Sequence, residues 1–283
     1  MKRSAVGGGG GGGAPDPAHL LRRRPSGLAA PDQHAGGYTK MSNTATALPG
    51  QETLVASWDA LARISSGARL VHSAAATAAV FPSWAPLNNA ILLNGHDGDA
   101  AAAAAIELTG VYADAGVDGW ALWVPSAATD LDATDYVQRV GGFRRDTTTL
   151  VMQARLSPGL RLHDGVVRAS IADAARAGDE PVPFTDLGEP DTEPGLTGWV
   201  MVHDELAVAG AWSLLHEQDC GVYAVGTVPG WRRRGLARSL VEHVLADARL
   251  HGARTATLQS TRIAQQLTSA CIFWPEARRA ESA

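Results

Sequence analysis

The fold expected for this chain is decided by residues 222–240, which read V-Y-A-V-G-T-V-P-G-W-R-R-R-G-L-A-R-S-L. The first half of this stretch is an apolar run typical of a buried strand, and Pro229-Gly230 opens a turn. A helix pattern then follows and ends at Gly252, with an apolar stripe made of Leu236, Leu240, Val241, Val244, Leu245 and Ala248. Another strand pattern follows at once, at 253–259. The segment therefore indicates a strand, a turn, a helix and a second strand, with three consecutive arginines in the turn.

The turn between the strand and the helix has the composition of a phosphate-binding site. A helix N-terminus presents unpaired backbone N–H groups and the positive end of its dipole to an anion. Gly235 and Ala237 keep bulky side chains away from those groups, and the neighbouring arginines add positive charge. A pyrophosphate is the anion that this arrangement predicts. An ordinary turn with surface arginines is the alternative.

The same turn resembles the acetyl-CoA signature of the GNAT superfamily of N-acetyltransferases. That signature reads (Q/R)-x-x-G-x-(G/A) and is matched by Arg232, Gly235 and Ala237, within a resemblance that spans about residues 166–259. It implies that strand backbone holds the pantetheine arm and thioester, and that turn backbone holds the pyrophosphate. The residues assigned to the coenzyme in this way are Val225, Gly226, Thr227, Arg232, Arg233, Arg234, Gly235, Leu236, Ala237 and Arg238.

The resemblance also implies two groups that handle protons during acetyl transfer. A base accepts the proton of the acceptor amine, and Glu217 or His216, just before the strand, are candidates for it. A solvated loop residue is the alternative for each. A tyrosine in the family motif L-Y-x-x-x-G-F protonates the leaving thiolate, but residues 267–273 read L-T-S-A-C-I-F. Thr268 therefore stands at the tyrosine position, with a hydroxyl too short and too weakly acidic for that role.

A change of reading frame after Leu267 accounts for this departure. Thr268-Ser269-Ala270-Cys271 can be encoded ACG AGC GCC TGC, and restoring one T in front gives TAC GAG CGC CTG, or Tyr-Glu-Arg-Leu. The restored frame yields the L-Y-E-R-L of the family, although the next residue would be His rather than Gly. We therefore expect the domain to be truncated or out of frame over 268–283. These residues should pack poorly, and the nearby strand edge should be open or covered only by the other lobe.

The N-terminal half repeats the strand and helix order of the C-terminal half. Strands and helices alternate there, at 89–93, 97–115, 120–125, 130–140 and 147–155. Its first turn, N-G-H-D-G-D at 94–99, lacks the phosphate signature, and it loosely has the acidic spacing of a calcium loop without the distal glutamate. A turn with a helix cap is the interpretation adopted. We expect 51–158 to be a degenerate acetyltransferase-like lobe, similar to the inactive half of tandem acetyltransferases, and 159–283 to be the acetyl-CoA-binding domain.

The remaining segments are predicted from composition and spacing. Strands are expected at 166–170, 198–202, 206–214 and 221–228, a short helix at 171–177, and helical spacing occurs over 51–79. The loop 178–195 carries six acidic residues and no Lys or Arg. It is either a solvated connection or an acidic rim that favours a cationic acceptor. Residues 1–50, with a glycine run and scattered proline, predict a disordered tail, and Met41 is a second candidate for the translation start.

Composition excludes several classes of protein. The 283 residues predict about two domains, and 45% hydrophobic with 19% charged residues supplies a sizeable core. A net charge of −5 argues against nucleic acid or an anionic membrane as the main partner. Two cysteines without a C-x-x-C pair exclude a disulfide framework and do not suggest zinc. No apolar run approaches the length of a membrane span.

Together these observations lead us to expect a cytoplasmic α/β enzyme. Its mixed sheet with flanking helices should form a GNAT-like acetyltransferase fold in two related lobes. It should transfer an acetyl group from the cosubstrate acetyl-CoA to a small-molecule or peptide amine, by direct attack in a ternary complex and without a metal. The oligomeric state stays open. An acetyl-CoA-binding pseudoenzyme or a damaged gene product with little turnover is the alternative.

Overall fold

The computed structural model describes residues 18–23, 50–93, 98–124, 142–178, 193–261 and 274–275, which form a mixed α/β structure. The helices are α1 (Gln51–Arg63), η1 (Ala85–Leu87), α2 (Gly98–Asp114), α4 (Ile171–Ala177), η3 (Pro229–Trp231) and α5 (Leu236–Leu250). The first strands are β1 (Ala18–Arg23), β2 (Arg69–His72), β3 (Ala76–Val80), β4 (Asn89–Leu92), β5 (Ala121–Val124) and β6 (Phe143–Arg155). The others are β7 (Val166–Ala169), β8 (Leu196–His203), β9 (Leu206–His216), β10 (Asp219–Thr227), β11 (Thr255–Thr261) and β12 (Trp274–Pro275).

The strands form one mixed sheet that runs through both halves of the molecule. Their order is β2-β3-β4-β5-β1-β6-β11-β10-β9-β8-β7, and β12 pairs with β6. Two pairs are parallel, β4 with β5 and β10 with β11, and each is connected by a helix, α2 or α5. A parallel pair needs such a crossover. The order β2-β3-β4-α2-β5 is thus repeated as β8-β9-β10-α5-β11, which gives two related lobes.

Most of the predicted elements are confirmed. The predicted helix at 171–177 coincides with α4, and its N-cap is Ser170, whose Oγ accepts a hydrogen bond from the Asp173 N–H at 3.0 Å. Helices α2 and α5 end just before Gly116 and Gly252, the predicted stop residues. These glycines have φ of 69° and 100°. Positive φ at a helix end favours glycine, which is why the stop signal was readable in the sequence.

The structure corrects two predictions about the N-terminal part. Helical spacing over 51–79 ends at Arg63, because β2 and β3 follow. All five residues of β3 are buried, so packing overrides the helix propensity of its alanines. Within the segment expected to be a disordered tail, Ala18–Arg23 form β1, which pairs with both β5 and β6. The six residues of β1 contain two adjacent leucines, and so short a segment shows no recognisable alternation of apolar and polar residues.

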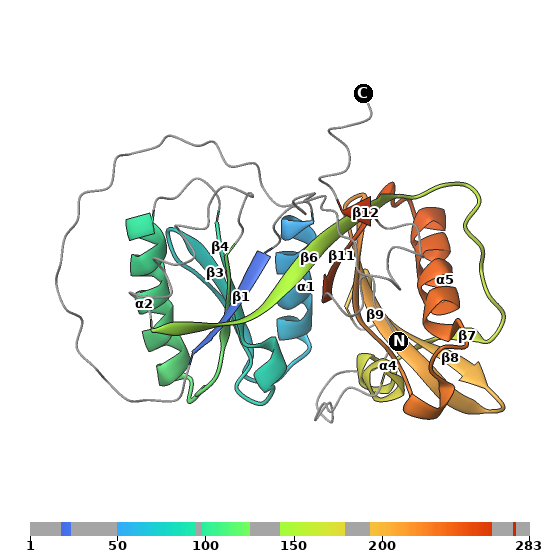
Figure 1. Cartoon of the computed structure of the whole chain (residues 1–283), viewed down its shortest axis with the longest axis horizontal. Helices are drawn as coiled ribbons and strands as arrows, with labels where there is room; N and C mark the ends of the chain where they lie inside the picture. The colour runs from blue at the N-terminus through green and yellow to red at the C-terminus, as the bar shows by residue number, and fades with distance from the viewer. Residues whose placement is uncertain are drawn as a thin grey trace, which may run out of the picture.

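Helix α1 is shared by the two lobes. Figure 1 shows it between the two halves, and its apolar residues Leu54, Trp58 and Leu61 belong to one buried cluster. That cluster contains Phe81 and Ile91 from the N-terminal lobe, and it also contains Trp212, Leu214 and Tyr223 from β9 and β10. Burying a large apolar side chain contributes about 1.5–3 kcal/mol. The helix therefore joins the two lobes through a common core.

Strand β6 is also shared. It pairs with β1 along its first half and with β11 along its second half, from Thr149↔Thr261 to Arg155↔Thr255 (Figure 1). The edge of β11 is therefore covered by a strand from the N-terminal half. Of the residues after 267, the structure describes Trp274 and Pro275, which pair with Gln153 and Met152 on β6. The lobe boundary expected after 158 falls just beyond this common strand.

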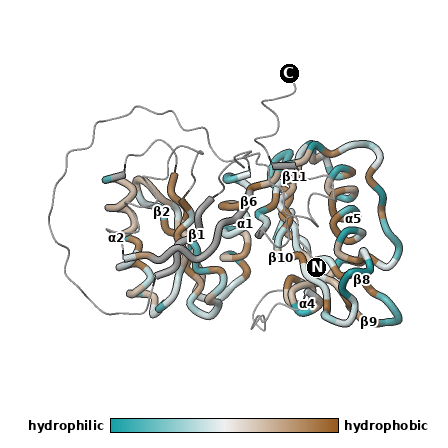
Figure 2. Tube along the Cα trace, in the orientation of Figure 1, coloured by the Kyte–Doolittle hydropathy of each residue, from teal (hydrophilic) through white to brown (hydrophobic). Residues whose placement is uncertain are grey.

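The crossover helices of the two lobes differ in hydropathy. Figure 2 shows α2 in mostly pale and brown colours, whereas α5 carries teal and brown residues along its whole length. The buried stripe of α2 is built on alanine and completed by two larger residues: Ala101, Ala104, Ala105, Leu108 and Tyr112. The buried stripe of α5 contains Leu240, Val241, Val244 and Leu245, as the sequence pattern predicted. The α5 helix is thus the more strongly amphipathic of the two.

The segment between β6 and β7 is held against α5 by histidines. The His163 N–H donates to Nδ1 of His243 at 2.9 Å, and His163 Nε2 lies 3.1 Å from a Glu242 carboxylate oxygen. Burial lowers the pKa of His243, although a hydrogen bond from its ring to the His163 carbonyl oxygen, 3.1 Å from Nδ1, and the charge of Asp247 act in the opposite direction. Neutral imidazole is therefore the form of His243 that fits this contact.

The lowered pKa of His243 predicts acid destabilisation. In the unfolded chain His243 takes up a proton below about pH 6.5, whereas the folded protein resists this, so the free energy of unfolding should fall as pH drops below that value. His243→Asn keeps an acceptor near the Nδ1 position without a titrating ring. Denaturant unfolding between pH 5 and pH 8 should therefore show a flatter pH dependence in this variant. An unchanged dependence would rule out His243 as the cause.

Candidate coenzyme site

Strands β10 and β11 form a fork. They pair in parallel at Asp219↔Thr255, Cys220↔Ala256 and Gly221↔Thr257, and within the described residues their pairing stops there. β10 continues to Thr227 beside β9, while β11 continues to Thr261 beside β6. The two strands therefore have no shared ladder beyond Gly221, and the backbone of β10 that the sequence assigns to the thioester lies on one arm of this fork.

A bulge bends the β10 arm. The pairing of β10 with β9 shifts register between Tyr223 and Gly226, and Ala224 has φ of 48°. Such an irregularity leaves extra residues outside the ladder and turns their backbone groups in a new direction. In the N-terminal lobe, the corresponding pairing of β3 with β4 has no register shift over its described residues. The bulge thus distinguishes the C-terminal lobe from the N-terminal lobe over the described residues.

Glycines allow α4 to approach the same strands closely. A Cβ at Gly226 would overlap the Gly178 carbonyl oxygen, and a Cβ at Gly210 would overlap that of Ala174. A Cβ at Gly198 on β8 would likewise overlap the Ser170 carbonyl oxygen. The sequence assigned Gly226 to the coenzyme, but its lack of a side chain is explained by this packing. The other two glycines were not recognised, because glycine within a strand gives no sign of what approaches it.

The turn after β10 presents backbone amides. Ser239 N–H donates to the Gly235 carbonyl at 3.0 Å, the first bond of α5. Among the described residues, the N–H groups of 233–238 have no acceptor. Arg233 has φ of 62° and Gly235 has φ of 82°, a left-handed backbone that curves successive N–H groups around a common centre. A Cβ at Gly235 would meet no atom within 4 Å. Open space at a helix N-terminus with unpaired amides fits a phosphate.

The arginines of the turn have different surroundings. Arg232 donates from Nε to the Thr227 carbonyl at 2.9 Å, which ties the turn to the end of β10. Arg234 lies 4.7 Å from the ring centre of Trp231, and that ring lies 4.6 Å from the ring of His203 on β8. Arg233 and Arg238 are exposed. The structure thus brings all ten predicted coenzyme residues together, in the β10 arm and in the turn that follows it.

The predicted base residues lie elsewhere. Glu217 is exposed in the turn between β9 and β10 and has φ of 52°, and His216 is the last residue of β9. The chain from 217 to 225 spans roughly 26 Å at ~3.3 Å per residue. The structure does not bring either residue to Val225. Thr268, at the position of the expected tyrosine, lies outside the described residues.

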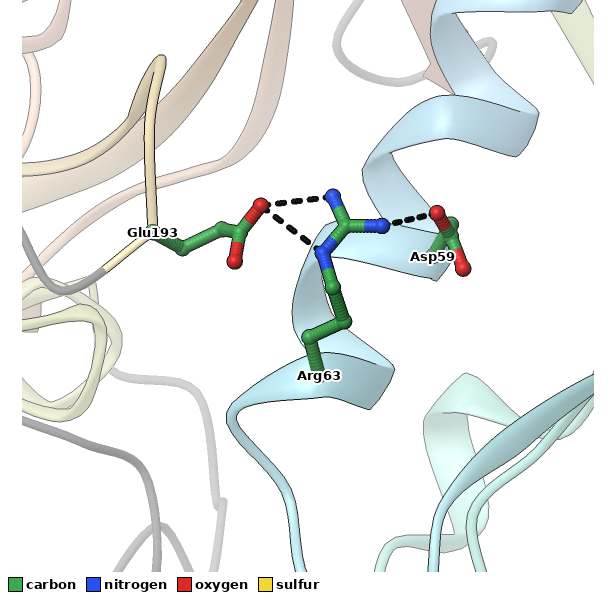
Figure 3. A network of polar contacts seen from close by, with 3 residues as sticks. All are labelled: Asp59, Arg63 and Glu193. Carbon is green, nitrogen blue, oxygen red and sulfur yellow. Dashed lines mark hydrogen bonds and ion pairs between the residues drawn. The ribbon is translucent and has the colours of Figure 1, made fainter.

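The acidic loop is described only at its end. Glu193, just before β8, accepts hydrogen bonds from Arg63 Nε at 2.9 Å and Nη2 at 2.6 Å, and Arg63 also contacts Asp59 (Figure 3). The hydrogen bond to Glu193 raises the pKa of Arg63, and this effect outweighs the burial that acts to lower it. Glu193 is therefore engaged in an ion pair with α1. The other five acidic residues of the loop lie outside the described residues.

Two further polar residues of β10 are buried. Burial raises the pKa of the Cys220 thiol far above its usual range, so Cys220 is not a reactive thiolate. Burial likewise raises the pKa of Tyr223, whose hydroxyl donates to the Thr53 carbonyl at 3.2 Å. Within the described ranges no three His, Cys, Asp or Glu side chains could hold a metal ion. No helix in that part of the chain is long and apolar enough to cross a membrane.

Comparisons with known proteins agree with this geometry. Residues 167–271 match the model of the acetyltransferase (GNAT) family. The GCN5-related N-acetyltransferase from Kribbella flavida is 18% identical, with a TM-score of 0.55 over 79% of this chain and 91% of that chain. A functionally unknown conserved protein from Staphylococcus epidermidis ATCC 12228 is 10% identical, with a TM-score of 0.49 over 75% and 92%. A GCN5-related N-acetyltransferase from Sphaerobacter thermophilus is 12% identical, with a TM-score of 0.43 over 86% of each chain. No curated protein matches the sequence significantly.

The family match covers the C-terminal lobe, and the likeness of fold covers both lobes. The matched residues contain the fork, the bulge and the arginine turn. The Kribbella flavida protein shares the fold over most of both chains, so the likeness extends across the two lobes. The expected α/β fold in two related lobes is confirmed. Residues 167–271 thus match the acetyltransferase (GNAT) family, and the fold of both lobes is that of a GCN5-related N-acetyltransferase.

Proposed function

We propose that this protein transfers an acetyl group from acetyl-CoA to an amine acceptor in a ternary complex. The observation that carries the proposal is the fork between β10 and β11, which leads to the unpaired amides of 233–238. A long thiol ester with a charged pyrophosphate fits a strand arm that ends at an anion-binding turn. A small-molecule or peptide amine is the acceptor class.

The proposed reaction is a direct transfer. The acceptor nitrogen attacks the thioester carbon, a C–N bond forms, and the C–S bond breaks. The nitrogen loses a proton, and the departing thiolate takes one up. No enzyme nucleophile is needed, in keeping with the buried thiol of Cys220.

The chain contributes alignment and charge stabilisation. The backbone of Val225, Gly226 and Thr227 would hold the pantetheine arm and thioester, and an N–H of this arm would polarise the carbonyl. The backbone of 233–238 would hold the pyrophosphate, with Arg232, Arg233, Arg234 and Arg238 adding positive charge. Glu217 and His216 lie near the start of β10, too far from Val225 to support a role as the base. The proton donor of the family would stand at Thr268.

A coenzyme-binding protein with little turnover is the second candidate. Threonine at position 268 favours it, because the family's proton donor is then missing. Thiol release on mixing the protein with acetyl-CoA and a panel of amines separates the two candidates. Turnover supports the enzyme, whereas calorimetric binding without thiol release supports the second candidate. A protein that neither binds acetyl-CoA nor releases thiol would contradict both.

We also propose that the N-terminal lobe binds no coenzyme, so calorimetry of the full chain should give one acetyl-CoA per chain. The β3–β4 pairing has no shift that would turn backbone groups toward a ligand. Asp99 lies in the first turn of α2, where its charge would repel a phosphate. A stoichiometry of two would contradict the degenerate-lobe reading.

A further inference from the structure

The base of the fork is held by one carboxylate. Asp219 Oδ2 accepts hydrogen bonds from Thr257 Oγ1 at 2.7 Å and from Thr53 Oγ1 at 2.8 Å. Its Oδ1 accepts from Thr255 Oγ1 at 2.7 Å. Two of these hydroxyls come from β11, and the third comes from α1. Hydrogen bonds to a carboxylate are short and stronger than neutral ones, so this cluster fixes β10, β11 and α1 relative to one another.

Helix α1 contacts the base of the fork at two more points. Gly50, its N-cap with φ of 68°, lies so close to Thr257 that a Cβ would overlap the threonine side chain. The Tyr223 hydroxyl donates to the Thr53 carbonyl at 3.2 Å, and the Tyr223 ring stacks on Trp212 at 4.2 Å. Tyr223 directly precedes the bulge. Thr53 and Thr257 are 3% and 0% exposed, so water does not compete for these contacts.

The arms of the fork are otherwise attached to different neighbours. The β10 arm is paired with β9, and the β11 arm is paired with β6. Three paired positions, from Asp219 to Gly221, join the two strands to each other directly. Val225 lies roughly 13 Å beyond Gly221 along the strand, so a small rotation at the base moves the arm tip by a larger distance. The base therefore sets how far the arms open.

We propose that α1, a helix of the N-terminal half, sets the opening of the β10–β11 fork through Thr53 and Asp219, which are positioning residues for the pantetheine arm. This inference rests on the proposed function. Under this proposal the N-terminal lobe helps to position the coenzyme site, although that lobe is proposed to bind no coenzyme itself. A mispositioned arm weakens contacts made inside the fork and leaves the anion-binding turn at α5 intact.

The test compares three substitutions in the full-length protein. Thr53→Val removes the hydroxyl that reaches Asp219, and Thr53→Ser retains it. Thr109→Val is the matched control, because the Thr109 hydroxyl donates to Ala105 within α2 and the same chemical change is made in the same lobe. Calorimetry measures the Kd for acetyl-CoA and for adenosine 3′,5′-bisphosphate, which carries phosphate groups but no pantetheine arm. Steady-state kinetics measure KM and kcat.

We expect Thr53→Val to raise the Kd and KM for acetyl-CoA about tenfold, the equivalent of one hydrogen bond to a charged group. Its Kd for the bisphosphate should not change. Thr53→Ser should restore acetyl-CoA binding, and Thr109→Val should resemble the parent protein. A merely structural Thr53 would lower Tm without this separation of the two ligands.

Three other results would overturn the inference. If Thr53→Val binds acetyl-CoA as tightly as Thr109→Val does, α1 does not set the fork, while the proposed function stands. If both ligands weaken equally, the effect is not confined to the pantetheine arm. A parent protein that binds no acetyl-CoA would overturn the proposed function and this inference with it. Binding without turnover would overturn the proposed reaction alone, since the Kd comparison still decides the role of Thr53.

Discussion

Gly235→Asp is expected to abolish acetyl-CoA binding. Gly235 caps α5 at φ of 82° beside the unpaired amides, and its missing side chain leaves open space. An aspartate would place a carboxylate where the pyrophosphate is proposed to lie. Two unit charges about 4 Å apart repel by about 4 kcal/mol at an effective dielectric near 20, so calorimetry should show a loss of about a thousandfold.

Two control variants separate charge from backbone strain. Gly67→Asp introduces the same residue at φ of 72°, also with no atom within 4 Å of its Cβ, but in the turn after α1. We expect it to bind acetyl-CoA normally. Gly235→Asn keeps the shape without the charge, and asparagine tolerates this backbone, so its loss should be smaller. Equal affinity of Gly235→Asp and the parent protein would refute the assignment of the turn.

Restoring the reading frame after Leu267 is expected to raise turnover. The chain with one base restored carries tyrosine at position 268, followed by Glu, Arg and Leu as in the family motif. A general acid contributes about 10²–10⁴-fold, so kcat should rise by that factor while the Kd for acetyl-CoA changes little. The measurement is thiol release under saturating acetyl-CoA and amine.

Point variants test the same idea without altering the following residues. Thr268→Tyr should recover part of the gain, and Ser269→Tyr, which moves the ring by one position, should recover none. Sequencing the locus gives an independent check. Codons that cannot encode Tyr-Glu-Arg-Leu in the shifted frame, or full turnover by the present chain, would end the frameshift hypothesis.

Local signals explain why the strand, turn and helix at residues 219–250 could be predicted. The period of the α5 stripe, its glycine stop and the glycine at its start all act within a few residues of one another. The predicted helix at 235–251 and the strand at 221–228 therefore lie within two residues of α5 and β10. The pyrophosphate prediction stays a prediction, but the backbone it needs is present.

Features that depend on distant contacts were not predictable. Ala224 has no preference for positive φ, so the bulge leaves no trace in the sequence. In the sequence, Thr53, Thr255 and Thr257 look like ordinary helix and strand residues. Their shared role becomes visible only in the fold, where all three hydroxyls donate to Asp219. Glu217 illustrates the opposite case, in which nearness in the sequence does not bring a residue to the proposed thioester arm. It is close to the thioester strand in sequence, but it lies at the strand's far end.

The sharing of α1 between lobes also affects how the protein is made. Thr53 and its partner Asp219 are 166 positions apart. A ribosome adding ~5–20 residues per second needs about 8–33 s between them. For most of that interval Leu54, Trp58 and Leu61 lack the β9 side chains that cover them in the finished molecule, and the β10 residue Tyr223 is made only after it. We therefore expect the nascent chain to bind chaperones before residue 219 is made, and the yield of folded protein to depend on translation speed.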